Sequence, residues 1–305
     1  MKQPMKTTAG ILSDGDKCTA AEYLAKAGMD WTVSKRQLGW VNEDNEFIES
    51  DNAFGIVRDD IGLTLGTCKK TYKEIQNTEI STPLDAVVRN GDARYVSAGE
   101  VRNGALIWLQ CKLPYAADIV PGDKMNFYKC LFKGHTGKDA ARYVENNVRM
   151  SCSNQTFSVM NASQGLSRIT HKGNVQFKLE QAQALIRESV EHAKRQVETY
   201  RNLAKLQMTT KRIKEYTELM FPAGEGEMPR HIEKKREMLH SFAETSPGTE
   251  IPGVRGTGWA WHNALTYYLN YHVGHASNPD ARLMANVSGG AKRLAEQSVR
   301  VLSLM

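Results

Sequence analysis

The sequence lacks a long apolar run and a paired cysteine motif. No stretch approaches the ~20 apolar residues that cross a bilayer, and the N-terminal segment lacks the apolar core of an export signal. The five cysteines, an odd number, include no C-x-x-C spacing, so the sequence predicts neither a disulfide framework nor a zinc knuckle. We therefore expect a cytoplasmic protein with reduced thiols and no membrane partner.

Motifs of known catalytic chemistry are also missing. The run Gly134–Asp139 carries two glycines and Lys138, but a phosphate loop needs G-x-x-x-x-G-K followed by Ser or Thr, and Asp139 follows here. This run is instead typical of a hairpin turn between strands. No G-x-S-x-G or H-E-x-x-H motif occurs, although His262, His272 and His275 lie close in sequence. We predict no catalytic residue, no metal and no cofactor.

Charge is unevenly balanced toward the basic side. The 305 residues include 40 Lys and Arg against 34 Asp and Glu, a net charge of +6. A basic excess favours polyanions such as nucleic acid over acidic small molecules.

The pattern of the chain predicts an α+β fold: antiparallel β-hairpins with helices in the N-terminal half, then a helical C-terminal half. Residues 1–18 are expected to be a mobile arm, residues 19–171 an α+β core, and residues 172–305 a helical region packed on that core. Thr19 is a candidate N-cap for the first helix, and Asn103-Gly104 a strong hairpin signal. Expected hairpins lie at 54–68, 94–113 and 124–144, the acidic stretch 37–53 is expected to be a loop, and a long amphipathic helix is expected over 174–206.

Basic residues concentrate on the predicted sheet between residues 89 and 158, interleaved with Tyr and Trp. Cations can follow a phosphate backbone while aromatic rings stack on bases, although strand alternation allows only about half of them to share a face. Trp108 is expected to be buried. The candidate nucleic-acid contacts are Arg94, Arg102, Lys112, Lys133, Lys138, Arg142 and Arg149.

Several segments in a common order resemble the phage/plasmid-like proteins, a domain family of unknown function. They are Gly28-Met-Asp-Trp-Thr-Val33, Val57-Arg-Asp-Asp-Ile-Gly-Leu-Thr-Leu-Gly66, Tyr72-Lys-Glu-Ile-Gln-Asn77, Ser97-Ala-Gly99, Val148-Arg-Met-Ser-Cys-Ser-Asn154, His171-Lys-Gly-Asn174 and Gly256-Thr-Gly-Trp-Ala-Trp-His-Asn-Ala-Leu-Thr266. The family's N-terminal tryptophan–histidine–glycine segment is not visible. The resemblance implies a mobile-element setting in the cytoplasm of a bacterial host cell, and by analogy a likeness to phage single-strand annealing proteins of the RecT and Red-beta type.

The leading hypothesis is a protein that binds and anneals single-stranded DNA in homologous recombination, as a homo-oligomeric ring or filament. One alternative is a metal-dependent, nuclease-like enzyme that uses Asp59 and Asp60 with His135. Those two acids also suit a tight turn for backbone reasons alone. The other alternative is a protein-interaction factor, such as a host antagonist.

Overall fold

The computed structural model describes residues 6–9, 18–89, 93–149, 154–158, 168–226, 228–273 and 290–305. They belong to two compact units that interleave along the chain. The first unit takes Met1–Pro114, Tyr128–Glu145 and Val159–Ser189, and the second takes Tyr115–Phe127, Asn146–Ser158 and Val190–Met305. The predicted α+β class is confirmed, with antiparallel sheets ahead of a helical C-terminal half.

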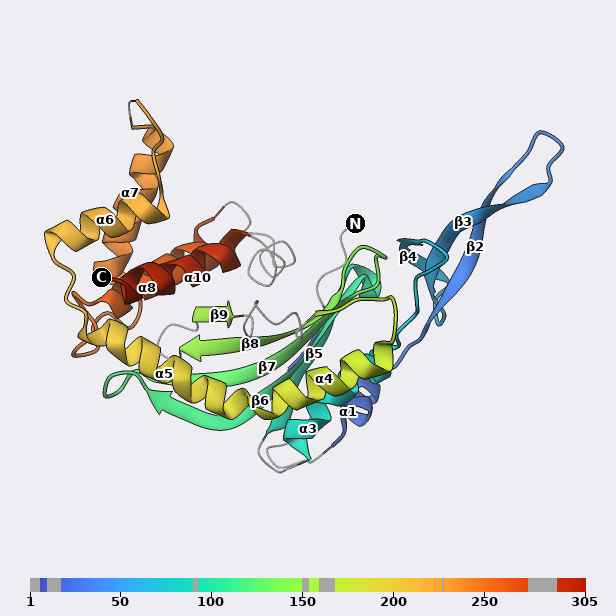
Figure 1. Ribbon diagram of the computed structural model, residues 1–305, viewed down its shortest axis with the longest axis horizontal. Coiled ribbons are helices and arrows are strands. Elements are labelled where there is room, and N and C mark those ends of the chain that lie inside the picture. Colours follow the sequence, from blue (N-terminus) through green and yellow to red (C-terminus); the bar gives the residue numbers. More distant parts are fainter. Residues whose placement is uncertain are drawn as a thin grey trace. The chain divides into compact units, whose positions relative to one another are not determined.

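The larger sheet has seven strands in the order β1-β5-β6-β7-β8-β10, with β9 paired to β8. Figure 1 labels its strands β5 to β9. Most of the expected mobile arm, 1–18, lies outside the described residues, but β1 within it pairs antiparallel with β5. The strands are β1 (Lys6–Ala9), β5 (Arg94–Val101), β6 (Leu106–Asp118), β7 (Lys124–Gly134), β8 (Ala141–Arg149), β9 (Asn154–Ser158) and β10 (Arg168–Ile169).

The expected turn between β5 and β6 is confirmed. A short 3₁₀ segment, η2 (Arg102–Gly104), joins the strands, with φ of 54° at Asn103 and 95° at Gly104. Asn and Gly tolerate this left-handed region. A Cβ at Gly104 would lie 2.6 Å from the Trp31 ring, so the position also needs glycine for space.

In the first unit, helices cover one face of this sheet. They are α1 (Ala20–Lys26), α2 (Asn77–Ser81), the 3₁₀ segment η1 (Thr82–Leu84), α3 (Asp85–Val88) and α4 (Val175–Arg187). Leu24, Ile80 and Leu179 from these helices pack with Leu109 and Tyr143 from the strands, in one apolar cluster.

Capping and buried hydrogen bonds hold α1 in place. The predicted cap is confirmed: Thr19 accepts a hydrogen bond from the Glu22 backbone, and the Glu22 carboxylate accepts one from the Thr19 N–H in return. The buried Asp85 carboxylate accepts from the Ala20 N–H and the Tyr95 hydroxyl, at 2.7 Å each. These bonds tie α1 to α3 and to β5.

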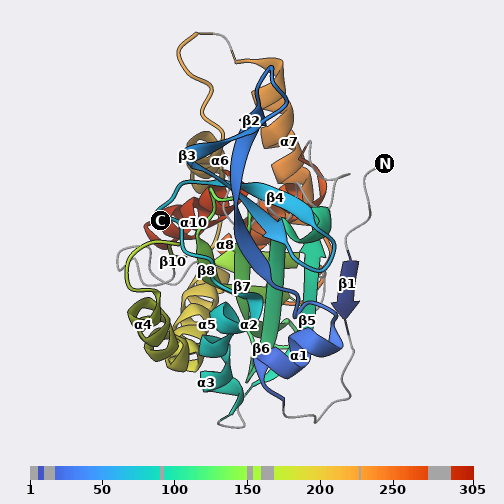
Figure 2. The same ribbon diagram turned by 90° about the vertical axis from the view of Figure 1, so that its right-hand side faces the viewer.

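A smaller sheet, also in the first unit, has the order β2-β3-β4 (Figure 2). It consists of β2 (Val33–Val41), β3 (Phe47–Arg58) and β4 (Leu63–Cys68). The predicted hairpin of β3 and β4 is confirmed, but the predicted loop over 37–53 is wrong, because most of this stretch forms the hairpin of β2 and β3. The acids of this stretch are exposed to solvent, so their charges do not prevent the two strands from pairing.

The helical part of the second unit contains α5 (Ser189–Lys205), α6 (Thr210–Met220), α7 (Arg230–Thr245), α8 (Gly258–Tyr271) and α10 (Gly290–Ser303). The single helix expected over 174–206 is wrong: a turn at Glu188 separates α4 from α5, where the chain passes from one unit to the other. Neither Pro nor Gly marks this break in the sequence.

Helix α8 forms the centre of this unit, and almost all of its residues are buried. Trp259 donates a hydrogen bond to Asp123 at 2.7 Å and packs on the ring of Tyr200. Among the described residues, no helix has the length and apolar character needed to cross a bilayer.

Candidate nucleic-acid interface

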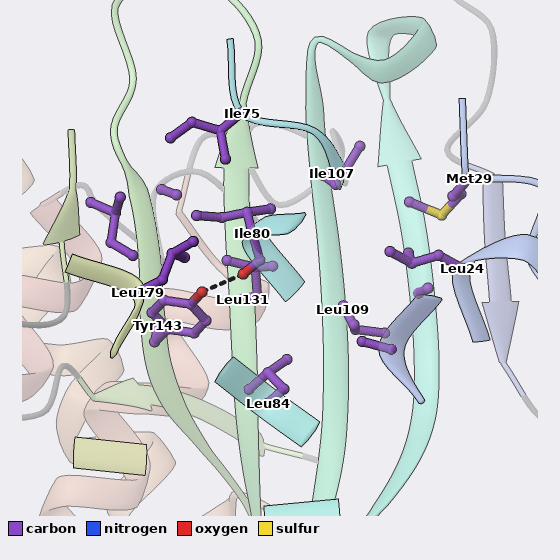
Figure 3. Packing of buried hydrophobic residues seen from close by; sticks show 14 of the residues in the cluster. Leu24, Met29, Ile75, Ile80, Leu84, Ile107, Leu109, Leu131, Tyr143 and Leu179 are labelled. Carbon is purple, nitrogen blue, oxygen red and sulfur yellow. Dashed lines mark hydrogen bonds between the residues drawn. The ribbon is translucent and has the colours of Figure 1, made fainter. Parts of the chain in front are cut away.

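Strand alternation decides which basic residues of the large sheet point away from the helices. Tyr95, Cys111 and Tyr143 belong to the apolar cluster beneath the helices (Figure 3 shows Tyr143 there, hydrogen-bonded to the Ile80 carbonyl). Their chain neighbours Arg94, Lys112 and Arg142 therefore point to the opposite face. Three of the seven predicted contacts share this surface.

The strand register brings these cations into pairs. Arg94 lies opposite Lys112 on β5 and β6. Arg142 lies opposite Arg168 on β8 and β10, while their neighbours Ala141 and Ile169 belong to the cluster on the helical side. Arg168, which is exposed and was not among the predicted contacts, therefore joins the same surface. We call Arg94, Lys112, Arg142 and Arg168 the cation face.

Acidic residues are segregated from the cation face. In the first unit's segments of β5 to β8, the described acids are Glu100 and Glu145, and both lie on the helical side. Glu100 forms an ion pair with Arg58 at 2.9 Å, and Glu145 pairs with Lys129 at 3.4 Å. Directly opposed like charges destabilise a strand pair, so two such pairs on one face break a local rule, as functional sites often do.

The middle of this face is apolar and closed. Trp108 and Phe132 are buried there, which agrees with the prediction for Trp108. Tyr128 is half-buried, and Ser97 donates a hydrogen bond to Gln110 at 3.0 Å beside the Arg94–Lys112 pair. The accessible chemistry is therefore cationic and hydrogen-bonding, with little aromatic surface for stacking.

The prediction that Lys133 contacts nucleic acid is wrong. Lys133 is completely buried on the helical side of β7 and donates a hydrogen bond to the Ile75 carbonyl. Burial lowers the pKa of Lys133 to about 7, and the charge of Glu79 only partly opposes this shift. Lys129, four residues earlier on β7 and on the same side, is buried as well.

The other predicted contacts are not brought into the cation face. Arg102 is exposed in the turn between β5 and β6, and Lys138 is exposed in the turn between β7 and β8. Arg149 ends β8, and its side chain lies outside the described residues.

The glycine run after β7 is a hairpin turn, as predicted, because the strand β8 follows it. This turn packs closely on β4: a Cβ at Gly66 would lie 2.3 Å from the Thr136 carbonyl oxygen, and one at Gly137 would lie 2.0 Å from that of Thr67. Thr136 donates a hydrogen bond to Asp139 at 2.8 Å. The close contact between the backbone of this turn and that of β4 leaves no room for a Cβ at Gly66 or at Gly137.

The acids considered for metal binding have separate structural roles. Thr32 and Ser34 donate hydrogen bonds to Asp59 at 2.7 Å, and these bonds lower its pKa. Asp60 accepts from Arg58 at 2.8 Å, which lowers the pKa of Asp60 too.

The histidines considered for metal binding are engaged as well. The His135 ring is buried 2.8 Å from the Asn77 amide oxygen, and His262 lies 3.0 Å from the Ser298 hydroxyl. His275 lies outside the described residues. Within the described part of the chain, His, Cys, Asp and Glu form no group of three that could hold a metal ion.

A family model described as "Domain of unknown function (DUF932)" matches residues 64–294, which is most of the chain. This chain belongs to the DUF932 family. No curated protein and no solved structure matches it. The matched DUF932 region contains all four residues of the cation face, but its description names no activity.

Proposed function

We propose that this DUF932 protein binds single-stranded DNA along the cation face and anneals complementary strands as an oligomer in homologous recombination of phage or plasmid DNA. The observation that carries the proposal is the set of two like-charge pairs, Arg94–Lys112 and Arg142–Arg168, on a face of the first unit's strand segments whose described acids, Glu100 and Glu145, lie on the other side. The mobile-element setting rests on the resemblance of the sequence to phage/plasmid-like proteins.

The spacing of the two pairs favours a polymer over a small anion. Strand β7 lies between β6 and β8 in the sheet, so Lys112 and Arg142 are two strands apart. Neighbouring strands lie about 4.8 Å apart, which separates the pairs by about 10 Å or more. Successive phosphates of an extended strand can follow a set of cations spread over this width.

The proposed mode of binding is electrostatic. Arg and Lys would neutralise phosphates and release counterions, and this term depends on salt but not on sequence. Because Trp108 is buried, base stacking on this face contributes little, which leaves bases free to pair with a second strand. No residue of the cation face has to perform chemistry in this scheme.

The test is a salt titration of binding to a fluorescently labelled oligothymidylate, followed by anisotropy. We expect affinity to fall steeply with salt. Arg142→Ala and Arg168→Ala should each weaken binding and reduce the slope of log K against log salt by about 0.7, the contribution of one single-strand phosphate contact. Annealing of complementary oligonucleotides is then measured with the same variants.

The matched control is Arg187→Ala. Arg187 is exposed on α4, the helix that packs on the opposite side of the sheet. Its removal changes the net charge equally but should leave the slope almost unchanged. Absence of binding at low salt refutes the proposal, and so does an equal loss in the control and the cation-face variants.

A further inference from the structure

The far half of the β2–β3 hairpin is a ribbon of only two strands. Gly39 to Val41 pair with Phe47 to Glu49, whereas β4 pairs with β3 only from Phe54 onward. The register shift between Gln37 and Gly39 leaves residues 50–53 of β3 outside the register of paired residues with β2. We call residues 39–49 the distal ribbon, and Figure 1 shows it running beyond the end of β4.

The distal ribbon exposes large apolar side chains on both of its faces. Val41 and Phe47 are opposite each other in the register and are 59% and 56% exposed, and Trp40, which is 59% exposed, points to the other face. A Cβ at Gly39 would lie 2.7 Å from the Phe47 ring, so this ring lies across the glycine. Single exposed apolar residues are ordinary, but three on one narrow ribbon indicate an interaction site.

The charge of this segment restricts what can cover it. Residues 37–53 contain five acids and no Lys or Arg: Glu43, Asp44, Glu46, Glu49 and Asp51. Such a segment repels nucleic acid and anionic lipid. Subtracting its charge of −5 from the net +6 leaves the rest of the chain at +11. A basic surface that also exposes apolar side chains is the complement, and the remainder of this same chain carries both a positive net charge and exposed apolar residues such as Leu219 and Leu304.

We propose that the distal ribbon docks on a second copy of this chain. Its apolar residues would be covered on both faces, and its acids would meet a basic surface of the neighbour. An isolated two-stranded ribbon is only marginally stable in water, so docking would also stabilise its pairing. Because the ribbon meets a different surface on the neighbour, the contact is head-to-tail, and repetition builds a ring or an open filament.

Sedimentation velocity without nucleic acid tests this docking. The full-length protein should form assemblies larger than a monomer that shrink as salt rises. The double variant Trp40→Ser/Phe47→Ser should sediment as a monomer, and the charge-reversal variant Glu43→Lys/Asp44→Lys should lose most of the assembly. The matched control is Phe177→Ser, since Phe177 on α4 is 55% exposed but lies outside the ribbon, and this variant should assemble normally.

Tryptophan fluorescence gives a second readout that does not depend on a variant. Of the five tryptophans, Trp40 is 59% exposed, while Trp31, Trp108, Trp259 and Trp261 are buried. Acrylamide should therefore quench mainly Trp40, and this quenching should increase on dilution as the ribbon undocks. The proposal is overturned if the wild type is monomeric at every concentration, if the ribbon variants assemble like the wild type, or if quenching ignores dilution. Each outcome is independent of DNA binding.

Discussion

Lys133 should make the stability of this protein rise with pH above neutrality. Burial lowers the pKa of its ammonium group to about 7, from an ordinary value of 10.5. Between these values the unfolded state holds a proton on Lys133 that the folded state lacks, so unfolding binds a proton and stability increases with pH. The full slope for one group is about 1.4 kcal/mol per pH unit, and because Lys133 is half protonated in the folded state at pH 7, the gain between pH 7 and pH 9 is about 2 kcal/mol. About one pH unit below 7, Lys133 is protonated in both states and this dependence ends.

The measurement compares the free energy of unfolding in urea for the wild type and for Lys133→Met, at several pH values. Other buried groups titrate in both proteins and cancel in the difference. The wild type should gain about 2 kcal/mol relative to the variant from pH 7 to pH 9. Lys138→Met is the control for the loss of one lysine, because Lys138 is exposed in the turn that follows β7. Parallel curves for wild type and Lys133→Met would refute the reasoning.

Two further predictions concern stability and are checked by urea unfolding. Lys129→Ala should cost about 3–5 kcal/mol because it leaves Glu145 buried without its ion-pair partner, whereas replacing both residues by apolar ones of similar volume should recover most of this loss. Gly137→Ala should destabilise more than Gly62→Ala: both glycines have positive φ, but only at Gly137 would the new methyl group meet a backbone atom, the Thr67 carbonyl oxygen. Gly62 has open space, so its variant should lose only about 1–2 kcal/mol from backbone strain. Equal losses at the two glycines would contradict the close packing of the turn on β4.

Local signals in the sequence were sufficient for much of the fold. The N-cap at Thr19 and the turn at Asn103-Gly104 depend on neighbouring residues alone, and both are confirmed. The prediction of a loop over 37–53 was wrong because acids and exposed apolar residues interrupt the alternation of apolar and polar residues that marks a half-buried strand. Neither face of the distal ribbon is buried in the chain itself, so no pattern reveals it.

The cation face could be predicted only in part, because the sequence of a strand does not show with which distant strand it pairs. Arg168 lies in a strand of two residues, and only its position opposite Arg142 identifies it as part of the cation face. The prediction for Lys133 was wrong for a different reason. On β7 both faces carry buried apolar residues, Leu131 on one and Phe132 on the other, so the sequence does not say which face its lysines share.

The two sides of the sheet differ in how their cationic side chains are placed. On the helical side, the buried Lys129 is paired with Glu145, and Lys133 donates to a carbonyl with its pKa lowered by burial, so little net charge remains beneath the helices. On the other side, Arg142 and Arg168 stand opposite each other, and arginine cannot relieve this repulsion by losing a proton. Stability alone would favour an acid at one of these two positions. An external anion that binds both guanidinium groups would remove the repulsion, and this is the physical basis on which we propose polyanion binding for this face and a structural role for the lysines of β7.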